Sequence, residues 1–119
     1  AGRRGVGQRV GEGLRARKPV LPGARVVRSG GLNRPPMEPT EASLALFAKA
    51  RAIGEALGLR LEPGRVGGGS DGNFTAALGV PTLDGLGLFG GDAHQKTEYV
   101  VVPEIPRRTA LLAELLAAL

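Results

Sequence analysis

Apolar side chains recur at helical spacing in two long segments of the chain. After Thr40, a residue that suits a helix N-cap, one face collects the apolar residues Leu46, Phe47, Ala50, Ile53 and Leu57. Gly58 follows directly and is the kind of residue that ends a helix. The pattern therefore predicts a helix between Thr40 and Gly58.

The C-terminal segment has the same periodicity. Pro106 suits the first turn of a helix. Leucines then line one side of that helix: Leu111, Leu112, Leu115, Leu116 and Leu119. Two weaker helices are also predicted. The first has a thin stripe of Val6, Val10 and Leu14 interrupted by glycines. The second is capped by Ser70 or Asp71 and stopped by Gly79.

Short β-type runs separate these helices. They lie at residues 24–28, 59–61, 80–83 and 99–102, and the last is a compact β-branched run. Residues 33–37 are expected to be extended, because a residue before proline is pushed out of the helical region. The alternation of helices and strands predicts an α/β fold.

Composition narrows the class of protein. The chain has 119 residues, enough for one domain, and no cysteine, so it has neither disulfides nor thiolate metal ligands. No apolar run approaches the roughly 20 residues that a membrane helix needs. We therefore expect a protein of the cytoplasm with no membrane partner.

The positive charge is concentrated at one end of the chain. Residues 1–30 hold eight Lys or Arg against one acid, whereas the rest of the chain has a net charge of −2. Such a head could be an arm for nucleic acid or another polyanion. It has no aromatic residue for base stacking, which favours an ordinary solvated helix face. Nucleic-acid binding remains an alternative.

A glycine-rich turn at residues 67–74 precedes the short predicted helix. Backbone N–H groups at such a turn suit an anionic ligand. A second glycine pattern, GxGxxG at residues 85–90, resembles a dinucleotide fingerprint letter for letter. We reject that interpretation, because no helical period follows it.

Two further side chains are candidates for chemistry. His94, the one histidine, lies in a polar loop near Asp92 and Glu98 and offers a single nitrogen to a metal. Catalytic zinc usually takes three protein ligands, so the chain would have to find the others among its acids. Arg34 lies in a stiff Asn-Arg-Pro-Pro segment. It could be an ordinary surface arginine, or its guanidinium could bind a substrate carboxylate, and the spacing favours neither interpretation.

Four segments in order resemble the C-terminal end of a known family. They are Gly-Gly-Leu-Asn-Arg-Pro-Pro-Met at 30–37, Gly-Gly-Gly-Ser-Asp-Gly-Asn-Phe at 67–74, Leu-Gly-Val-Pro-Thr-Leu-Asp-Gly-Leu-Gly at 78–87, and Ala-His…Glu-Tyr-Val at 93–100. The family is that of the di-zinc peptidases and deacylases, which includes glutamate carboxypeptidase, acetylornithine deacetylase and succinyl-diaminopimelate desuccinylase. The resemblance covers about residues 20–119 and is strongest to the glutamate-carboxypeptidase branch.

The resemblance implies a particular fold and assembly. Residues 1–37 would be a remnant of an α+β lid and dimerisation domain. Residues 38–119 would be the C-terminal part of the catalytic α/β domain. The parent protein would be a homodimer acting on a small peptide or an N-acyl amino acid.

The resemblance also implies roles for individual residues. His94 falls at the family's last zinc ligand, and Arg34 at the lid arginine that grips the substrate carboxylate. Gly69 and Ser70 fall in the loop lining the substrate pocket, with Asn33 a weaker candidate beside them. The family's other zinc ligands and its general base have no counterpart in the 119 residues. The chain by itself is therefore expected to be inactive, and a truncated pseudoenzyme that pairs with a complete subunit is a further alternative.

Overall fold

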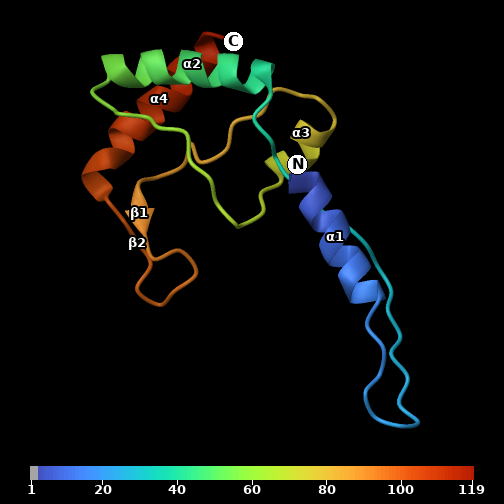
Figure 1. The fold of residues 1–119 in the computed structure, drawn as a ribbon. Coiled ribbons are helices and arrows are strands. Elements are labelled where there is room, and N and C mark those ends of the chain that lie inside the picture. Colours follow the sequence, from blue (N-terminus) through green and yellow to red (C-terminus); the bar gives the residue numbers. More distant parts are fainter. Residues whose placement is uncertain (1–2) are drawn as a thin grey trace. The chain divides into compact units, whose positions relative to one another are not determined.

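The computed structural model describes residues 3–119, which form two compact units (Figure 1). One unit contains the described residues up to Glu38 together with Gly69–Val80, and the other contains Pro39–Gly68 and Pro81–Leu119. The elements follow in the order α1 (Arg3–Arg15), α2 (Glu41–Ala56), α3 (Gly72–Ala77), β1 (Gly90–Gly91), β2 (Tyr99–Val100), the 3-10 turn η1 (Val102–Glu104) and α4 (Ile105–Ala117).

Helix α2 begins and ends where its sequence predicts. Thr40 is the N-cap: its hydroxyl accepts from the Ser43 N–H at 3.1 Å, and the Ser43 hydroxyl accepts from the Thr40 N–H at 2.9 Å. This reciprocal capping box satisfies two N–H groups that would otherwise lack partners. Gly58 takes a positive φ of 73° just past the helix end, a conformation that glycine adopts without steric cost.

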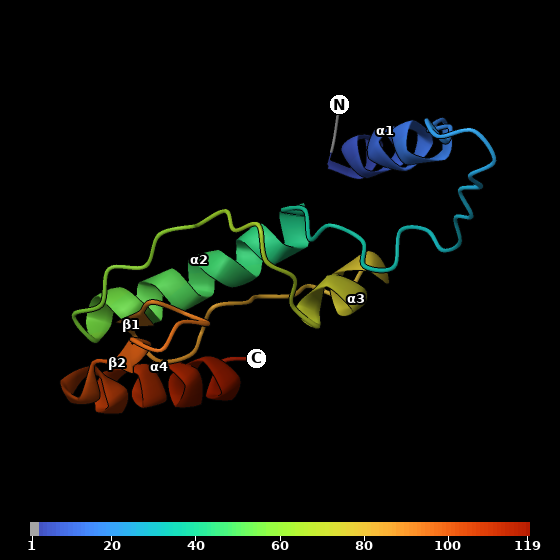
Figure 2. The same ribbon diagram turned by 90° about the horizontal axis from the view of Figure 1, so that it is seen from below.

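The small apolar core of the second unit lies where α2 packs against α4 (Figures 1 and 2). Ala50 and Gly54 of α2 are buried there, as are Leu111 and Leu115 of α4. The chain after α2 runs back along that helix, and a Cβ at Gly54 would lie 3.0 Å from the Leu61 side chain. The prediction of an apolar leucine face on α4 is thus confirmed for Leu111 and Leu115, whereas Leu112, Leu116 and Leu119 are exposed.

Most of the predicted strands are absent from residues 3–119. The sheet there consists of β1 and β2, paired antiparallel with Gly90 opposite Val100 and Gly91 opposite Tyr99. The runs at 24–28, 59–61 and 80–83 are not strands, so those three predictions are wrong. A strand needs a neighbour for its N–H and C=O groups, and these runs have none within the described chain. At 99–102 the strand stops at Val100, because η1 begins at Val102 with Pro103 in its first turn.

The first unit combines α1, α3 and extended chain. Its 24–28 segment follows α1, and the Arg28 guanidinium donates to the Arg15 carbonyl at the end of that helix. Helix α3 has six residues, fewer than two turns, and the chain after it takes a positive φ of 84° at Gly79. The helical and strand content is compatible with a fragment of an α/β peptidase. The assignment of residues 1–37 to a lid remnant and of 38–119 to a catalytic domain remains a prediction.

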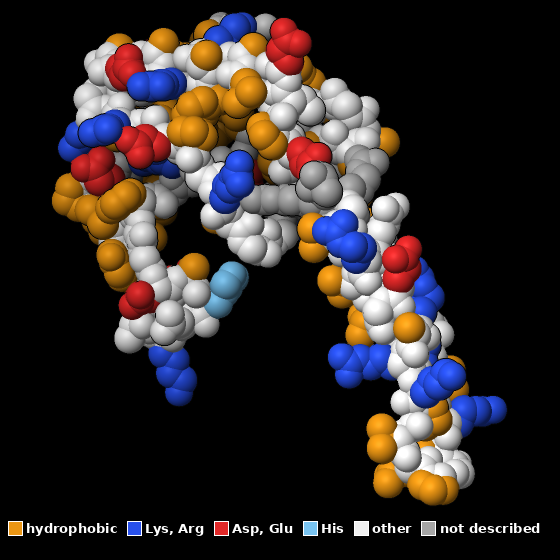
Figure 3. Space-filling view, in the orientation of Figure 1, with side chains coloured by type: hydrophobic (Ala, Val, Ile, Leu, Met, Phe, Trp, Pro, Cys, Tyr) orange, Lys and Arg blue, Asp and Glu red, His pale blue; other side chains and the backbone are white. Residues whose placement is uncertain are grey.

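Apolar side chains remain at the surface of both units (Figure 3). Within residues 3–119 the core contains only three buried hydrophobic residues, Ala50, Leu111 and Leu115. Exposed apolar surface of this kind is typical of contact surfaces and favours aggregation. No helix in this part of the chain is both long and apolar enough to cross a membrane.

Candidate functional site

The glycine-rich turn before α3 folds onto itself through polar contacts. The Ser70 N–H donates to Asn73 Oδ1 at 2.9 Å, and the Ser70 hydroxyl accepts from the Gly72 N–H at 3.1 Å. The N–H groups of Asn73 and Phe74 donate to the carbonyls of Ser70 and Asp71. Four backbone N–H groups are therefore already used, and the anion-binding role predicted for N–H groups at this helix start does not hold for them.

Arg34 lies against this turn. Its Nη1 is 3.3 Å from Asp71 Oδ1, and its guanidinium carbon lies 4.8 Å from the centre of the Phe74 ring. A Cβ at Gly69 would lie 2.8 Å from Arg34 Cδ, so the arginine stem uses the space that glycine leaves. The structure thus brings Arg34 and Gly69, two of the predicted substrate-binding residues, into contact.

The extended segment that carries Arg34 is tied to the same turn. The Asn73 side-chain amide donates to the Pro35 carbonyl at 2.7 Å while its oxygen accepts from Ser70. Asn73 is half-buried and bridges the two segments. This places Ser70 in the same cluster as Arg34, whereas Asn33 is exposed.

His94 belongs to the second unit and lies in the loop that joins β1 to β2. Asp92 and His94 both take positive φ angles, 56° and 68°, and the Gln95 N–H donates to the Asp92 carbonyl at 3.0 Å. The imidazole is exposed, and it is the pale-blue side chain in Figure 3. Left-handed backbone at two non-glycine residues within one short loop is uncommon and is enriched at functional sites.

The strands below this loop are held by close packing of Tyr99 on glycine. A Cβ at Gly91 would lie 2.8 Å from the Tyr99 hydroxyl, and one at Gly90 would overlap the Tyr99 carbonyl. Only glycine at these two positions lets the strands approach this closely. The hairpin therefore fixes the base of the loop that presents His94.

These side chains do not form a metal centre on their own. Within residues 3–119 no three His, Asp or Glu side chains come together in an arrangement that could hold a metal ion. His94 supplies one imidazole, whereas a catalytic zinc site takes about three protein ligands. The described residues therefore do not fit a complete zinc site.

The GxGxxG segment has a structural role. Arg108 of α4 donates to the carbonyls of Gly85 and Gly87 at 2.9 and 2.8 Å and so ties this loop to the helix. The loop leads into β1 and not into a helix. A dinucleotide motif needs a helix directly after its glycines, and this segment has none there.

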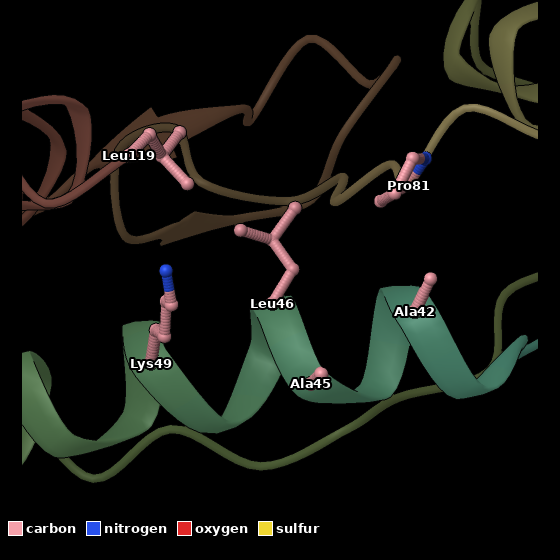
Figure 4. Close-up of a pocket in the computed structure, with 6 residues that line it drawn as sticks. All are labelled: Ala42, Ala45, Leu46, Lys49, Pro81 and Leu119. Carbon is pink, nitrogen blue, oxygen red and sulfur yellow. The ribbon is translucent and has the colours of Figure 1, made fainter.

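An apolar groove of about 350 Å³ lies between α2 and the C-terminal end of the chain (Figure 4). Leu46 and Lys49 of α2 point toward Leu119, and the Lys49 Nζ lies 3.5 Å from the Ala118 carbonyl. The other lining residues are Ala42, Ala45 and Pro81. The groove offers Lys49 as its one charged side chain, and none of the predicted site residues lines it.

Comparison with known proteins shows the family of the chain. Residues 10–118 match the family described as Peptidase family M20/M25/M40. The chain belongs to this family. It is also 37% identical over 105 residues to Carboxypeptidase G2 of Pseudomonas sp. (strain RS-16), a match that covers 86% of this chain and 25% of that protein. The chain thus spans about a quarter of the length of this peptidase, and no solved structure matches it significantly.

Membership of the M20/M25/M40 family confirms the resemblance read from the four motifs. The roles of Arg34, Asn33, Gly69, Ser70 and His94 remain predictions. Sequence reasoning missed the parts played by Asp71, Phe74 and Asn73. All three lie inside the motif at 67–74, but their contacts with residues 34–35 join segments far apart in the chain.

Proposed function

We propose that this chain is the C-terminal part of a hydrolase that cleaves an amide or peptide bond next to a free carboxylate. Family membership supports hydrolase chemistry, and the relative at 37% identity carries the name carboxypeptidase. The observation that carries the choice of substrate is the arrangement of Arg34. Its guanidinium is partly exposed, has one long ion pair and keeps further N–H donors for a ligand.

In this proposal Arg34 binds the substrate carboxylate and Asn73 holds the segment that presents it. A guanidinium fork matches a carboxylate in two parallel N–H···O bonds, which gives direction as well as affinity. Gly69 and Ser70 border the same place, so they would shape the pocket wall, with Asn33 at its edge. The substrate would be a small peptide or an N-acyl amino acid.

We further propose that the parent protein is zinc-dependent and that His94 supplies one of the metal ligands. Zinc would polarise the scissile carbonyl and activate water. The remaining ligands and the general base would come from residues outside these 119. A homodimeric parent in the cytoplasm, with residues 1–37 as lid remnant, completes the proposal.

The test uses the full-length protein, purified with zinc, and matched pairs of substrates. Each N-acyl amino acid with a free carboxylate is compared with its carboxamide. We expect hydrolysis of the acid and little of the amide. Hydrolysis of neither substrate, or of both at equal rates, would overturn the proposal.

Substitution of Arg34 sharpens this test. Arg34→Gln should lower kcat/KM for the acid by about 10- to 100-fold, the loss expected for a hydrogen bond to a charged group. The amide should be unaffected. Arg60→Gln is the matched control, because Arg60 is a surface arginine paired with Glu62 at 2.9 Å. It should change neither rate.

A further inference from the structure

Arg34 already has an anionic partner supplied by the protein itself. Asp71 Oδ1 is 3.3 Å from Arg34 Nη1, and the Asp71 side chain is 97% exposed. Asp71 is the carboxylate that the structure places against this guanidinium. A carboxylate in that place presents to Arg34 the same chemical group as the substrate would.

The ion pair between Arg34 and Asp71 is weak because of its geometry and its exposure. It is a single contact at long distance, and the acid is almost completely in water. Exposed ion pairs of this kind contribute little, because both partners are well solvated when apart. An incoming carboxylate that makes two N–H···O bonds would therefore displace Asp71 readily.

The guanidinium is held in place independently of this acid. The Phe74 ring lies 4.8 Å from the guanidinium carbon, and the missing Cβ of Gly69 makes room for the arginine stem. A guanidinium stacked on an aromatic face keeps its N–H edges free for a planar ligand. Loss of the Asp71 contact would therefore leave Arg34 facing the same way.

We propose that Asp71 is an internal competitor for Arg34 that sets how tightly the substrate carboxylate binds, with Phe74 and Gly69 as positioning residues for the arginine. This inference rests on the proposed function for its substrate. It assigns Asp71 a role in specificity: ligands that reach Arg34 with a complete carboxylate displace the acid, and ligands with a neutral amide do not.

The effects of substitution follow in opposite directions. Asp71→Asn removes the competing charge and should tighten the binding of a carboxylate ligand by about two- to fivefold, the range of an exposed ion pair. Phe74→Leu removes the stacking surface and should weaken the same binding by about two- to fivefold. Gly69→Ala places a methyl group against the arginine stem and should weaken binding further.

The experiment measures inhibition of the full-length protein by the amino acid product, a carboxylate that is not turned over. The product is compared with its carboxamide in wild type, Asp71→Asn and Phe74→Leu. Glu62→Gln is the matched control, since it removes a carboxylate that pairs with Arg60 elsewhere. We expect a lower inhibition constant for the acid in Asp71→Asn, a higher one in Phe74→Leu, and no change in the control or with the amide.

A double substitution separates local competition from a general charge effect. In an Arg34→Gln background, Asp71→Asn should no longer tighten binding, because the guanidinium for which Asp71 and the ligand compete is gone. The proposal is overturned if Asp71→Asn weakens binding in the wild-type background, or if its effect persists without Arg34.

A spectroscopic readout keeps this inference separate from the proposed function. In protein with 15N-labelled arginine, the Arg34 Nε–H resonance should move in both Phe74→Leu and Asp71→Asn, and titration with N-acetylalanine should move it again. If these shifts occur while no N-acyl amino acid is hydrolysed, the proposed function fails and the anion site stands. If hydrolysis is carboxylate-dependent but Asp71→Asn changes neither inhibition nor the resonance, the inference fails alone.

Discussion

Replacement of Leu111 by alanine tests the packing on which the second unit depends. Leu111 of α4 is 0% exposed and is the largest fully buried side chain among residues 3–119. Removing its branched end loses the transfer free energy of the buried carbons and leaves a cavity, together about 2–5 kcal/mol. Because the buried core between α2 and α4 is so small, few neighbouring side chains are available to fill that space.

Hydrogen exchange measured by mass spectrometry on peptides from α4 reports this loss in the full-length protein. A loss of about 2 kcal/mol makes opening about 30-fold more frequent, and larger losses scale tenfold for each 1.4 kcal/mol. Leu112→Ala is the matched control, since it makes the same change in the same helix at a side chain that is 42% exposed. It should accelerate exchange by less than about fivefold.

The reasoning would be refuted if the two variants exchanged at the same rate. Equal rates would mean that Leu111 is no better packed than its neighbour and that α2 and α4 do not share a core. A faster exchange in Leu112→Ala would be still more damaging.

Three further predictions concern the helix cap, the isolated chain and its basic head. Thr40→Ala removes one half of the capping box of α2 and should lower stability by about 1 kcal/mol, which makes hydrogen exchange in the first turn of α2 about fivefold faster. The control Thr109→Ala lies in α4 and should leave exchange in that turn unchanged. The isolated 119 residues should be poorly soluble or partly molten, because apolar faces of both units are exposed; a sharp, well-dispersed NMR spectrum would contradict this. The basic residues 1–30 should show no affinity for single-stranded nucleic acid at low salt, and binding that falls steeply with added salt would restore the alternative of a polyanion-binding arm.

The helices were predictable because their signals are local. Thr40 and Gly58 bound α2 in the sequence as they do in the structure, and Pro106 lies in the first turn of α4. Capping and helical periodicity act within a few residues, so they are legible without knowledge of the rest of the protein.

The strands were less predictable because their signals are not local. The β-type run at 80–83 has no partner strand in the described chain, and propensity alone does not make a strand. Conversely, Gly90 and Gly91 have no strand propensity, yet they pair with Val100 and Tyr99 because glycine permits the close approach. In both cases the presence or absence of a partner strand determines whether the segment is a strand.

The candidate site divides in the same way. Arg34 and the turn at 69–70 could be named from motifs, but the ion pair to Asp71 and the ring of Phe74 became visible only when residues far apart in the chain were brought together. For His94, the sequence shows one imidazole without the rest of a metal site, and within residues 3–119 it is not part of any group of three side chains that could hold a metal ion.

The most direct test of the account is the metal content and turnover of the full-length protein with His94→Ala. Zinc is measured by mass spectrometry on protein purified without added metal, with Gln95→Ala in the same loop as the matched control. The account predicts that His94→Ala loses bound zinc and nearly all hydrolysis of N-acyl amino acids, while the control keeps both. Full zinc content and full turnover in His94→Ala would contradict it.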